Sequence, residues 1–261
     1  MSLAEKCGLL DALIAAGIPM DRAMPGTGSC SLTDAVVMTS ASVQAGSAGA
    51  LVLPPFYYKG TGDDGLFRFF AELIERVGDA RLRVYLYHIP AVSGVGITPE
   101  LVERLLAAYP QQVAGMKDTG GDLSYTAMML NRFGHRGFDV FAGTETILLD
   151  TLRAGGPGCI TATANVSPSR IVELYDRFSA GISGAHAEAL QAGLSASRSM
   201  FAQWPLIASM KTSVAHFRGD PSWRTLRPPL TKLGDEQADL LIAQLKDAGF
   251  SMPGLDPEMS R

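Results

Sequence analysis

Short apolar segments alternate with amphipathic helical segments along most of the chain, and this alternation constrains the fold more than any other feature. The apolar segments recur at intervals of roughly 20–35 residues. Most are uninterrupted apolar runs, which are typical of parallel strands that are covered on both faces. The sequence therefore predicts six strands, at 21–26, 48–54, 83–89, 112–117, 138–143 and 158–163.

The helical segments between the strands begin with recognisable capping residues. Thr98-Pro99 and Ser167-Pro168 each place a hydroxyl at the N-cap and a proline at the first helical position. Thr144 is expected to cap the helix that follows it, and Ser2 with Glu5 forms a capping box at the start of the chain. These signals predict a helix after each of the four positions.

The alternation of strands and helices ends near residue 181, and only helices are predicted beyond it. The expected helices lie at about 185–203, 205–217 and 235–249. We therefore predict two domains: a β/α domain over 1–181 and a C-terminal helical domain over 182–261.

The number of predicted strands leaves two architectures open. A β/α barrel closes with eight strands, and six are found. Because residue 2 already begins a helix, a barrel would lack its first strand, first helix and second strand, roughly 50 residues, before Met1. An open doubly wound sheet of six strands needs nothing upstream. The pattern alone does not decide between them.

Composition narrows the functional classes. The chain of 261 residues is 47% hydrophobic and carries a net charge of −4, so it offers no basic surface for nucleic acid or an anionic membrane. Its three cysteines are widely spaced, and its four histidines show no metal-ligand spacing. We predict a cytoplasmic protein without a metal site.

Lys117 ends an apolar strand, which is an unusual place for a lysine. Burial disfavours the charged form of an amine, so a lysine at the mouth of a packed barrel becomes a better nucleophile. Such an amine can attack a carbonyl and form a Schiff base. The alternative is a lysine whose stem follows the apolar surface and whose charge reaches solvent. Lys117 by itself leaves the two interpretations equal.

Tyr87 ends the preceding strand, where a phenol could relay protons for Schiff-base chemistry. Its alternative role is that of a core tyrosine with its hydroxyl at the rim, which is the role expected for Tyr85 on the same strand face. His88 points to the opposite face and is predicted to be structural. Glu145 is the one acid placed at a strand end.

Five segments resemble, in order and spacing, the dihydrodipicolinate synthase / N-acetylneuraminate lyase family. They are VLPPFYYKG, LYHIPAVSGVGIT, VAGMKDTGGDL, FAGTE and GCITATANVSP. The resemblance implies a (β/α)8 barrel with a C-terminal helical domain, usually assembled as a homotetramer. It also implies that the protein binds pyruvate as a Schiff base and uses no metal or cofactor.

The resemblance also assigns roles to individual residues. Lys117 matches the Schiff-base lysine, Tyr87 the proton-relay tyrosine, and Tyr57 a tyrosine that reaches the site of a neighbouring subunit. Ile160 matches a residue whose carbonyl lines the pyruvate pocket, and Gly143 lies where the second substrate binds. The substrate site is further assigned Glu145, Thr119 and Ser93.

Two departures from the family pattern bear on function. The Gly-Thr-Thr-Gly-Glu segment that holds the pyruvate carboxylate is absent and would fall before Met1, which agrees with the strand count. The arginine of true dihydrodipicolinate synthases is replaced by Val92, and an apolar side chain cannot replace a guanidinium that grips a carboxylate.

We therefore expect a pyruvate-dependent class I aldolase or lyase that acts on a 2-keto-3-deoxy sugar acid or a related hydroxy-oxo acid. A dehydratase, or a dihydrodipicolinate synthase-type condensation, is the enzymatic alternative. A truncated relative without catalytic activity is the alternative of another class.

Overall fold

The structure is a computed structural model that describes residues 1–253 and 255. Its described part divides into two compact units, which are presented separately. Unit 1 contains residues 1–143 and 153–158, and unit 2 contains residues 144–152 and 159–261. The domain boundary expected at residue 181 stays a prediction.

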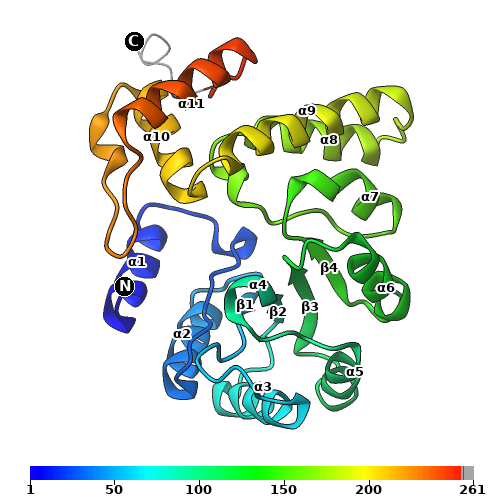
Figure 1. Ribbon diagram of the computed structural model, residues 1–261. Coiled ribbons are helices and arrows are strands. Elements are labelled where there is room, and N and C mark those ends of the chain that lie inside the picture. The colour runs from blue at the N-terminus through cyan, green and yellow to red at the C-terminus, as the bar shows by residue number, and fades with distance from the viewer. Residues whose placement is uncertain (254, 256–261) are drawn as a thin grey trace. The chain divides into compact units, whose positions relative to one another are not determined.

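Unit 1 contains a four-stranded parallel sheet and the helices that cover it (Figure 1). Its elements are α1 (Leu3–Ala15), η1 (Met20–Arg22), α2 (Leu32–Gln44), β1 (Ala50–Val52), α3 (Asp63–Val77), β2 (Val84–His88), α4 (Pro90–Ser93), α5 (Pro99–Ala108), β3 (Val113–Asp118), α6 (Leu123–Phe133), η2 (Gly134–Arg136) and β4 (Asp139–Ala142).

The strands lie side by side in the order of the chain, β1-β2-β3-β4, and every pair is parallel. A doubly wound sheet reverses its strand order at a switch point, whereas a β/α barrel keeps the order of the sequence. The sequential order is therefore that of a barrel, and the open doubly wound alternative is not supported.

Two of the six predicted strands form isolated pairings instead of ladders. In the segment 21–26 only Gly26 makes a bridge, to Leu51, because residues up to Arg22 form η1 and Pro25 has no N–H to donate. In the segment 158–163, Gly158 accepts a hydrogen bond from the N–H of Ala142 at 3.0 Å, and the chain then enters a 3-10 turn at residue 162. The bridge of Gly26 to Leu51 is parallel, so this segment continues the sequential order next to β1.

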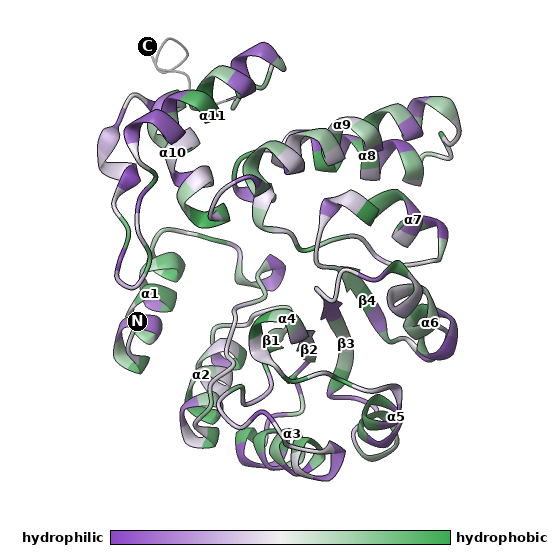
Figure 2. Cartoon of the chain, viewed as in Figure 1, coloured by the Kyte–Doolittle hydropathy of each residue, from purple (hydrophilic) through white to green (hydrophobic). Residues whose placement is uncertain are grey.

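The predicted helix starts in unit 1 are observed. Ser2 and Glu5 form the capping box of α1, with the hydroxyl of Ser2 accepting from the N–H of Glu5 at 3.2 Å. The hydroxyl of Thr98 accepts from the N–H of Leu101 at 3.0 Å at the start of α5. Figure 2 shows apolar and polar residues side by side on α2, α3 and α5, as expected of helices that cover a sheet.

The core of unit 1 lies between one face of the sheet and its covering helices. Val84 and Leu86 of β2 are fully buried there together with Met116 of β3. The alternate residues of β2, Tyr85 and Tyr87, are half-buried on the other face. The two faces therefore differ: one packs under helices, and the other carries the polar side chains.

All the named secondary-structure elements among the described residues of unit 2 are helices, joined by loops. Its elements are η3 (Glu145–Ile147), α7 (Leu148–Arg153, whose last residue belongs to unit 1), η4 (Ala162–Asn165), α8 (Pro168–Ser179), α9 (Ala185–Ala202), α10 (Leu206–Arg218), η5 (Pro221–Arg224) and α11 (Asp235–Asp247). Thr144 caps η3, and Pro168 starts α8, although the hydroxyl of Ser167 makes no cap hydrogen bond. Over the described range, no helix is both long and apolar enough to cross a membrane.

Candidate active site

Lys117 and Tyr87 are paired across β2 and β3. The parallel register places the two residues directly opposite each other, and His88 opposite Asp118. The Nζ atom of Lys117 donates to the Oη atom of Tyr87 at 3.1 Å and lies 4.3 Å from the centre of its ring. Both side chains are half-buried at the carboxyl ends of their strands. This edge of the sheet is where β/α barrels hold their reactive groups.

The sequence produces this pair through strand periodicity. Successive side chains of a strand point to opposite faces, so the apolar residues Leu86 and Met116 face the helices while Tyr87 and Lys117 face away from them. In Figure 2 the arrow of β3 ends in the colour of polar residues, where Lys117 and Asp118 lie. An amine and a phenol in hydrogen-bond contact can exchange a proton, which is what imine chemistry requires.

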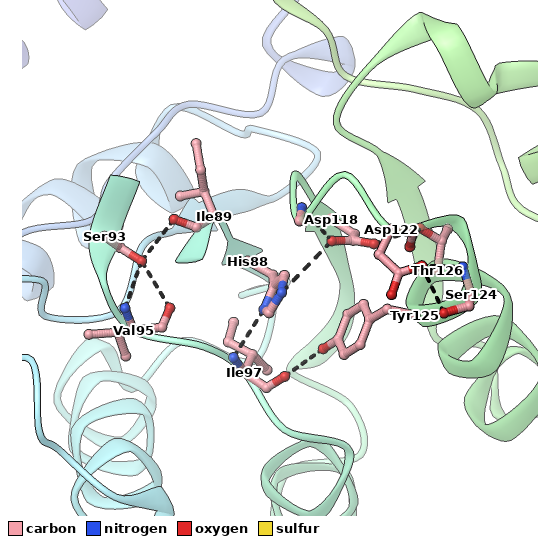
Figure 3. A network of polar contacts seen from close by, with 11 residues as sticks. His88, Ile89, Ser93, Val95, Ile97, Asp118, Asp122, Ser124, Tyr125 and Thr126 are labelled. Atoms are coloured by element: carbon pink, nitrogen blue, oxygen red, sulfur yellow. Dashed lines mark hydrogen bonds and ion pairs between the residues drawn. The ribbon is translucent and has the colours of Figure 1, made fainter. Parts of the chain in front are cut away.

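His88 and Asp118 lie on the helix-covered face and form a buried network there (Figure 3). The Nδ1 atom of His88 accepts from the N–H of Ile97 at 3.0 Å, so its proton lies on Nε2, which faces the Oδ1 atom of Asp118 at 4.0 Å. Burial lowers the pKa of His88, and the nearby charge of Asp118 acts in the opposite direction. The imidazole also stacks on Tyr125, with 4.6 Å between the ring centres.

Asp118 connects the end of β3 to the turn and the helix that follow it. Its carboxylate accepts from the N–H of Gly120 at 2.8 Å and from the hydroxyl of Thr126 at 2.5 Å. With His88, it fixes the backbone immediately after Tyr87 and Lys117. This network is structural and keeps the ends of the two strands in register.

The hydroxyl of Ser93 is buried and makes its hydrogen bonds to backbone atoms of neighbouring residues. It lies 3.0 Å from the carbonyl oxygen of Ile89 and 2.9 Å from that of Val95, and it accepts from the N–H of Val95 at 3.1 Å (Figure 3). These contacts shape the segment after β2. The assignment of Ser93 to the substrate site stays a prediction.

Thr119 and Gly143 lie next to each other just beyond the strands. The N–H of Gly143 donates to the carbonyl of Asp118 at 2.6 Å, and a Cβ atom at position 143 would lie 2.1 Å from the hydroxyl of Thr119. That hydroxyl is buried and has no hydrogen-bond partner among the described residues. A hydroxyl without a partner, two residues after Lys117, is available to a bound ligand.

Tyr57 is exposed on the loop that follows β1. Its side chain is 75% exposed, and its ring meets that of Tyr58 edge to face at 5.3 Å. Lys59 holds the loop, because its Nζ atom donates to the carbonyl oxygens of Phe56 and Ser93 at 2.5 and 2.8 Å. The structure does not bring Tyr57 into the contact between Lys117 and Tyr87.

Glu145 and Ile160 belong to unit 2. The carboxylate of Glu145 is buried and accepts hydrogen bonds from the hydroxyls of Thr161, at 2.5 Å, and Thr163. Ile160 is half-buried beside Thr161 in the sequence. Neither threonine was predicted from the sequence to be a site residue. Their alternation in the apolar segment 158–163 could have shown that they share one face.

A hydrogen-bonded pair of a phenol and a carboxylate was not predicted either. Tyr85, which was expected to be an ordinary core tyrosine, donates from its hydroxyl to the Oδ2 atom of Asp139 at 3.2 Å. Burial, followed by the charge of Asp139, raises the pKa of Tyr85 to about 12. Burial also raises the pKa of Asp139, against the effect of the hydrogen bond from Tyr85. The strand order that joins the two residues could not be read from either segment alone.

Comparison with known proteins assigns the chain to a family. Residues 2–248 match the model of the dihydrodipicolinate synthetase family. A DapA-like lyase of Chloroflexus aurantiacus is 31% identical over 243 residues, which are 93% of this chain and 79% of that protein. The 4-hydroxy-tetrahydrodipicolinate synthase of Thermus thermophilus is 37% identical over 158 residues, which are 60% of this chain and 51% of that enzyme. The chain thus matches about half of the length of the Thermus enzyme.

Solved structures show the same fold. YagE of E. coli K12, a prophage protein of the dihydrodipicolinic acid synthase family solved in complex with pyruvate, superposes with a TM-score of 0.86 at 25% identity, covering 96% of this chain and 83% of that one. The dihydrodipicolinate synthase of Agrobacterium tumefaciens gives 0.83 at 28% identity, covering 94% and 81%. With its sequential parallel strands and C-terminal helices, the chain belongs to the dihydrodipicolinate synthetase family of β/α-barrel lyases.

Proposed function

We propose that this protein is a class I aldolase or lyase in which Lys117 forms a Schiff base with pyruvate or another 2-keto acid. The observation that carries the proposal is the 3.1 Å contact between the Nζ atom of Lys117 and the Oη atom of Tyr87. It places a nucleophile beside a group that can accept and return its proton. The pyruvate bound to YagE supports the same class of substrate.

The proposed reaction needs only these two side chains for its proton transfers. The neutral amine of Lys117 adds to the keto carbon, and water leaves to give a protonated imine. In the cleavage direction the substrate hydroxyl gives up its proton, the C–C bond breaks, and its electron pair enters the imine to form an enamine. An aldehyde departs, the enamine takes up a proton at carbon, and water releases the keto acid. Tyr87 would accept and donate the protons at nitrogen and oxygen.

A 2-keto-3-deoxy sugar acid or a related hydroxy-oxo acid is the proposed substrate class. Val92, in the short helix α4 after β2, is 75% exposed and offers no charge to a second carboxylate. The Thermus relative is a 4-hydroxy-tetrahydrodipicolinate synthase, which makes a condensation of that type the main alternative. A dehydratase would use the same imine and eliminate water in place of an aldehyde.

The buried hydroxyl of Thr119, next to Gly143, is a proposed contact for the bound keto acid. Ser93, Glu145 and Ile160 remain proposed members of the same site. Tyr57, with three quarters of its side chain exposed, is proposed to contact a second copy of the chain in a cytoplasmic homo-oligomer.

The test is the intact mass of the protein after incubation with pyruvate and borohydride. We expect a mass gain of one reduced pyruvyl group, located at Lys117 by peptide mapping and lost in Lys117→Ala. Lys232→Ala is the matched control, because Lys232 is an exposed lysine in a distant segment of the sequence. An adduct that persists in Lys117→Ala would contradict the role of Lys117. If the wild-type chain formed no adduct, the alternative that this protein is a non-catalytic relative of the family would be favoured.

A further inference from the structure

The side chain of Tyr85 projects from the same face of the sheet as Lys117, one layer below it. It starts on β2, its ring projects between Gly49 and Gly115, and its hydroxyl reaches Asp139 on β4. Two glycines leave room for it. A Cβ atom at position 115 would lie 2.8 Å from the Cε1 atom of Tyr85, and one at position 49 would lie 2.7 Å from Cε2. Neither position could hold a larger side chain without moving the ring.

The registers of the three strands arrange these residues in two layers. Tyr85, Gly115 and Asp139 are mutual partners in the first layer, and Tyr87, Lys117 and Phe141 are partners in the second. The layers are two residues apart, or about 6.6 Å along the strands. Because Gly115 has no side chain, the ring of Tyr85 lies where the residue below Lys117 would otherwise project.

Among the residues of the four strands, Asp139 is the one acid on the same face of the sheet as Lys117, because Asp118 points to the helix-covered face. Asp139 and Lys117 lie on neighbouring strands and two positions apart, so their Cα atoms are separated by about 8 Å. Asp139 is half-buried, and its carboxyl accepts from Tyr85. Arg83, immediately before β2, is the other charged group that acts on the phenol of Tyr85, whose pKa it lowers. A carboxylate at this distance in a half-buried setting stabilises the ammonium form of a lysine.

We propose that Tyr85 and Asp139 are positioning residues for Lys117: the ring of Tyr85 supports the lysine stem, and the carboxyl of Asp139 sets how readily the amine loses its proton. This inference rests on the proposed function of Lys117 and assigns a role to the two residues in the layer below it. Tyr87 contacts the amine directly, whereas Tyr85 and Asp139 act on it from one layer below.

The test measures the protonation of Lys117 without any substrate. The chain would be acetylated with a trace of acetic anhydride over a range of pH, and each of its six lysines quantified by peptide mass spectrometry. In Asp139→Asn we expect the pH of half-maximal labelling of Lys117 to fall by about 0.5–1 unit, since the ammonium form loses its nearby counter-charge. The other five lysines serve as internal references.

Tyr85→Phe keeps the ring and removes its hydrogen bond. Without that donor the carboxyl of Asp139 takes up a proton more readily, so the midpoint for Lys117 should move in the same direction by a smaller amount. Tyr85→Ala removes the ring. We expect Tyr85→Ala to slow imine formation with pyruvate about 10-fold at every pH, because a lysine side chain without this support spends a smaller fraction of its time in a reactive geometry.

The chain offers a matched control in Tyr109 and Glu75. The hydroxyl of Tyr109 donates to the Oε1 atom of Glu75 at 2.5 Å, which is the same kind of pair on the covering helices. Tyr109→Phe and Glu75→Gln should leave the labelling midpoint of Lys117 unchanged. An equal shift in these controls would show a general electrostatic effect and overturn the inference.

The outcomes separate this inference from the proposed function. If the midpoint of Lys117 stays unchanged in both Asp139→Asn and Tyr85→Phe, the positioning role is wrong, even where the pyruvate adduct forms. If the midpoint shifts but the wild-type chain forms no pyruvate adduct, the positioning role holds and the Schiff-base function fails. Tyr85→Phe keeps the test valid if Asp139→Asn does not fold, because it removes one oxygen atom and leaves the packing intact.

Discussion

Replacing Asp118 tests whether the network behind Lys117 holds the ends of β2 and β3. Asp118→Leu removes a buried carboxylate that accepts from the N–H of Gly120 and the hydroxyl of Thr126. Thr126 has a weak alternative acceptor, the carbonyl of Asp122 at 3.5 Å, whereas the N–H of Gly120 has no other hydrogen-bond partner among the described residues. A hydrogen bond to a charged group contributes about 1.5–3 kcal/mol, so we expect Asp118→Leu to lower the free energy of unfolding by about 3–5 kcal/mol.

Asp118→Asn should cost less, because the amide can keep both contacts. Its oxygen can accept from Gly120, and its nitrogen can donate to the hydroxyl of Thr126. Only the charge is lost, so the expected cost is about 1–2 kcal/mol. Asp122→Asn is the control, since Asp122 caps α6 through the N–H of Ser124 at 2.9 Å and asparagine is an equally good cap.

The assay is urea denaturation followed by circular dichroism, combined with the rate of adduct formation with pyruvate. We expect the cost to increase from Asp122→Asn to Asp118→Asn to Asp118→Leu, and adduct formation to slow only in the two variants of Asp118. If Asp118→Leu were as stable as the wild type, the buried carboxylate would not hold the strand ends, and the argument for the network would fail.

Three further predictions concern the residues around Lys117. Tyr87→Phe should reduce turnover by roughly 10²–10⁴-fold while the chain still folds, since proton transfer by a positioned group contributes that much; full activity would remove Tyr87 from the mechanism. Folding lowers the pKa of His88 from 6.5, so the unfolded chain binds a proton more readily and the free energy of unfolding should decrease as the pH drops below about 6.5. Urea denaturation at several pH values should show a smaller decrease in His88→Gln, and an equal decrease would show that His88 does not cause it. Gly143→Ala should destabilise the chain by about 1–3 kcal/mol in thermal melts, because its Cβ atom would lie 2.1 Å from the hydroxyl of Thr119; wild-type stability would show that the loop adjusts freely.

Local features of this protein could be predicted from its sequence because they depend on neighbouring residues. The capping box of Ser2 and the cap of Thr98 are complete within four residues, and both are observed. Four predicted strands form ladders, since continuous apolar runs of that length suit a covered parallel sheet. Strand periodicity also predicted that Tyr85 and Tyr87 share one face of their strand and that His88 lies on the other, as observed.

Contacts between distant segments were decided only by the tertiary structure. The sequence indicates that 21–26 and 158–163 are apolar, but whether they form ladders depends on the hydrogen bonds that their neighbours offer, and they form isolated pairings. Tyr85 and Asp139 are 54 residues apart and meet only because the strand between theirs has a glycine, Gly115, beside both side chains. Periodicity determines which face a side chain occupies. The identity of its partner depends on strand order and register, which arise when the whole sheet packs.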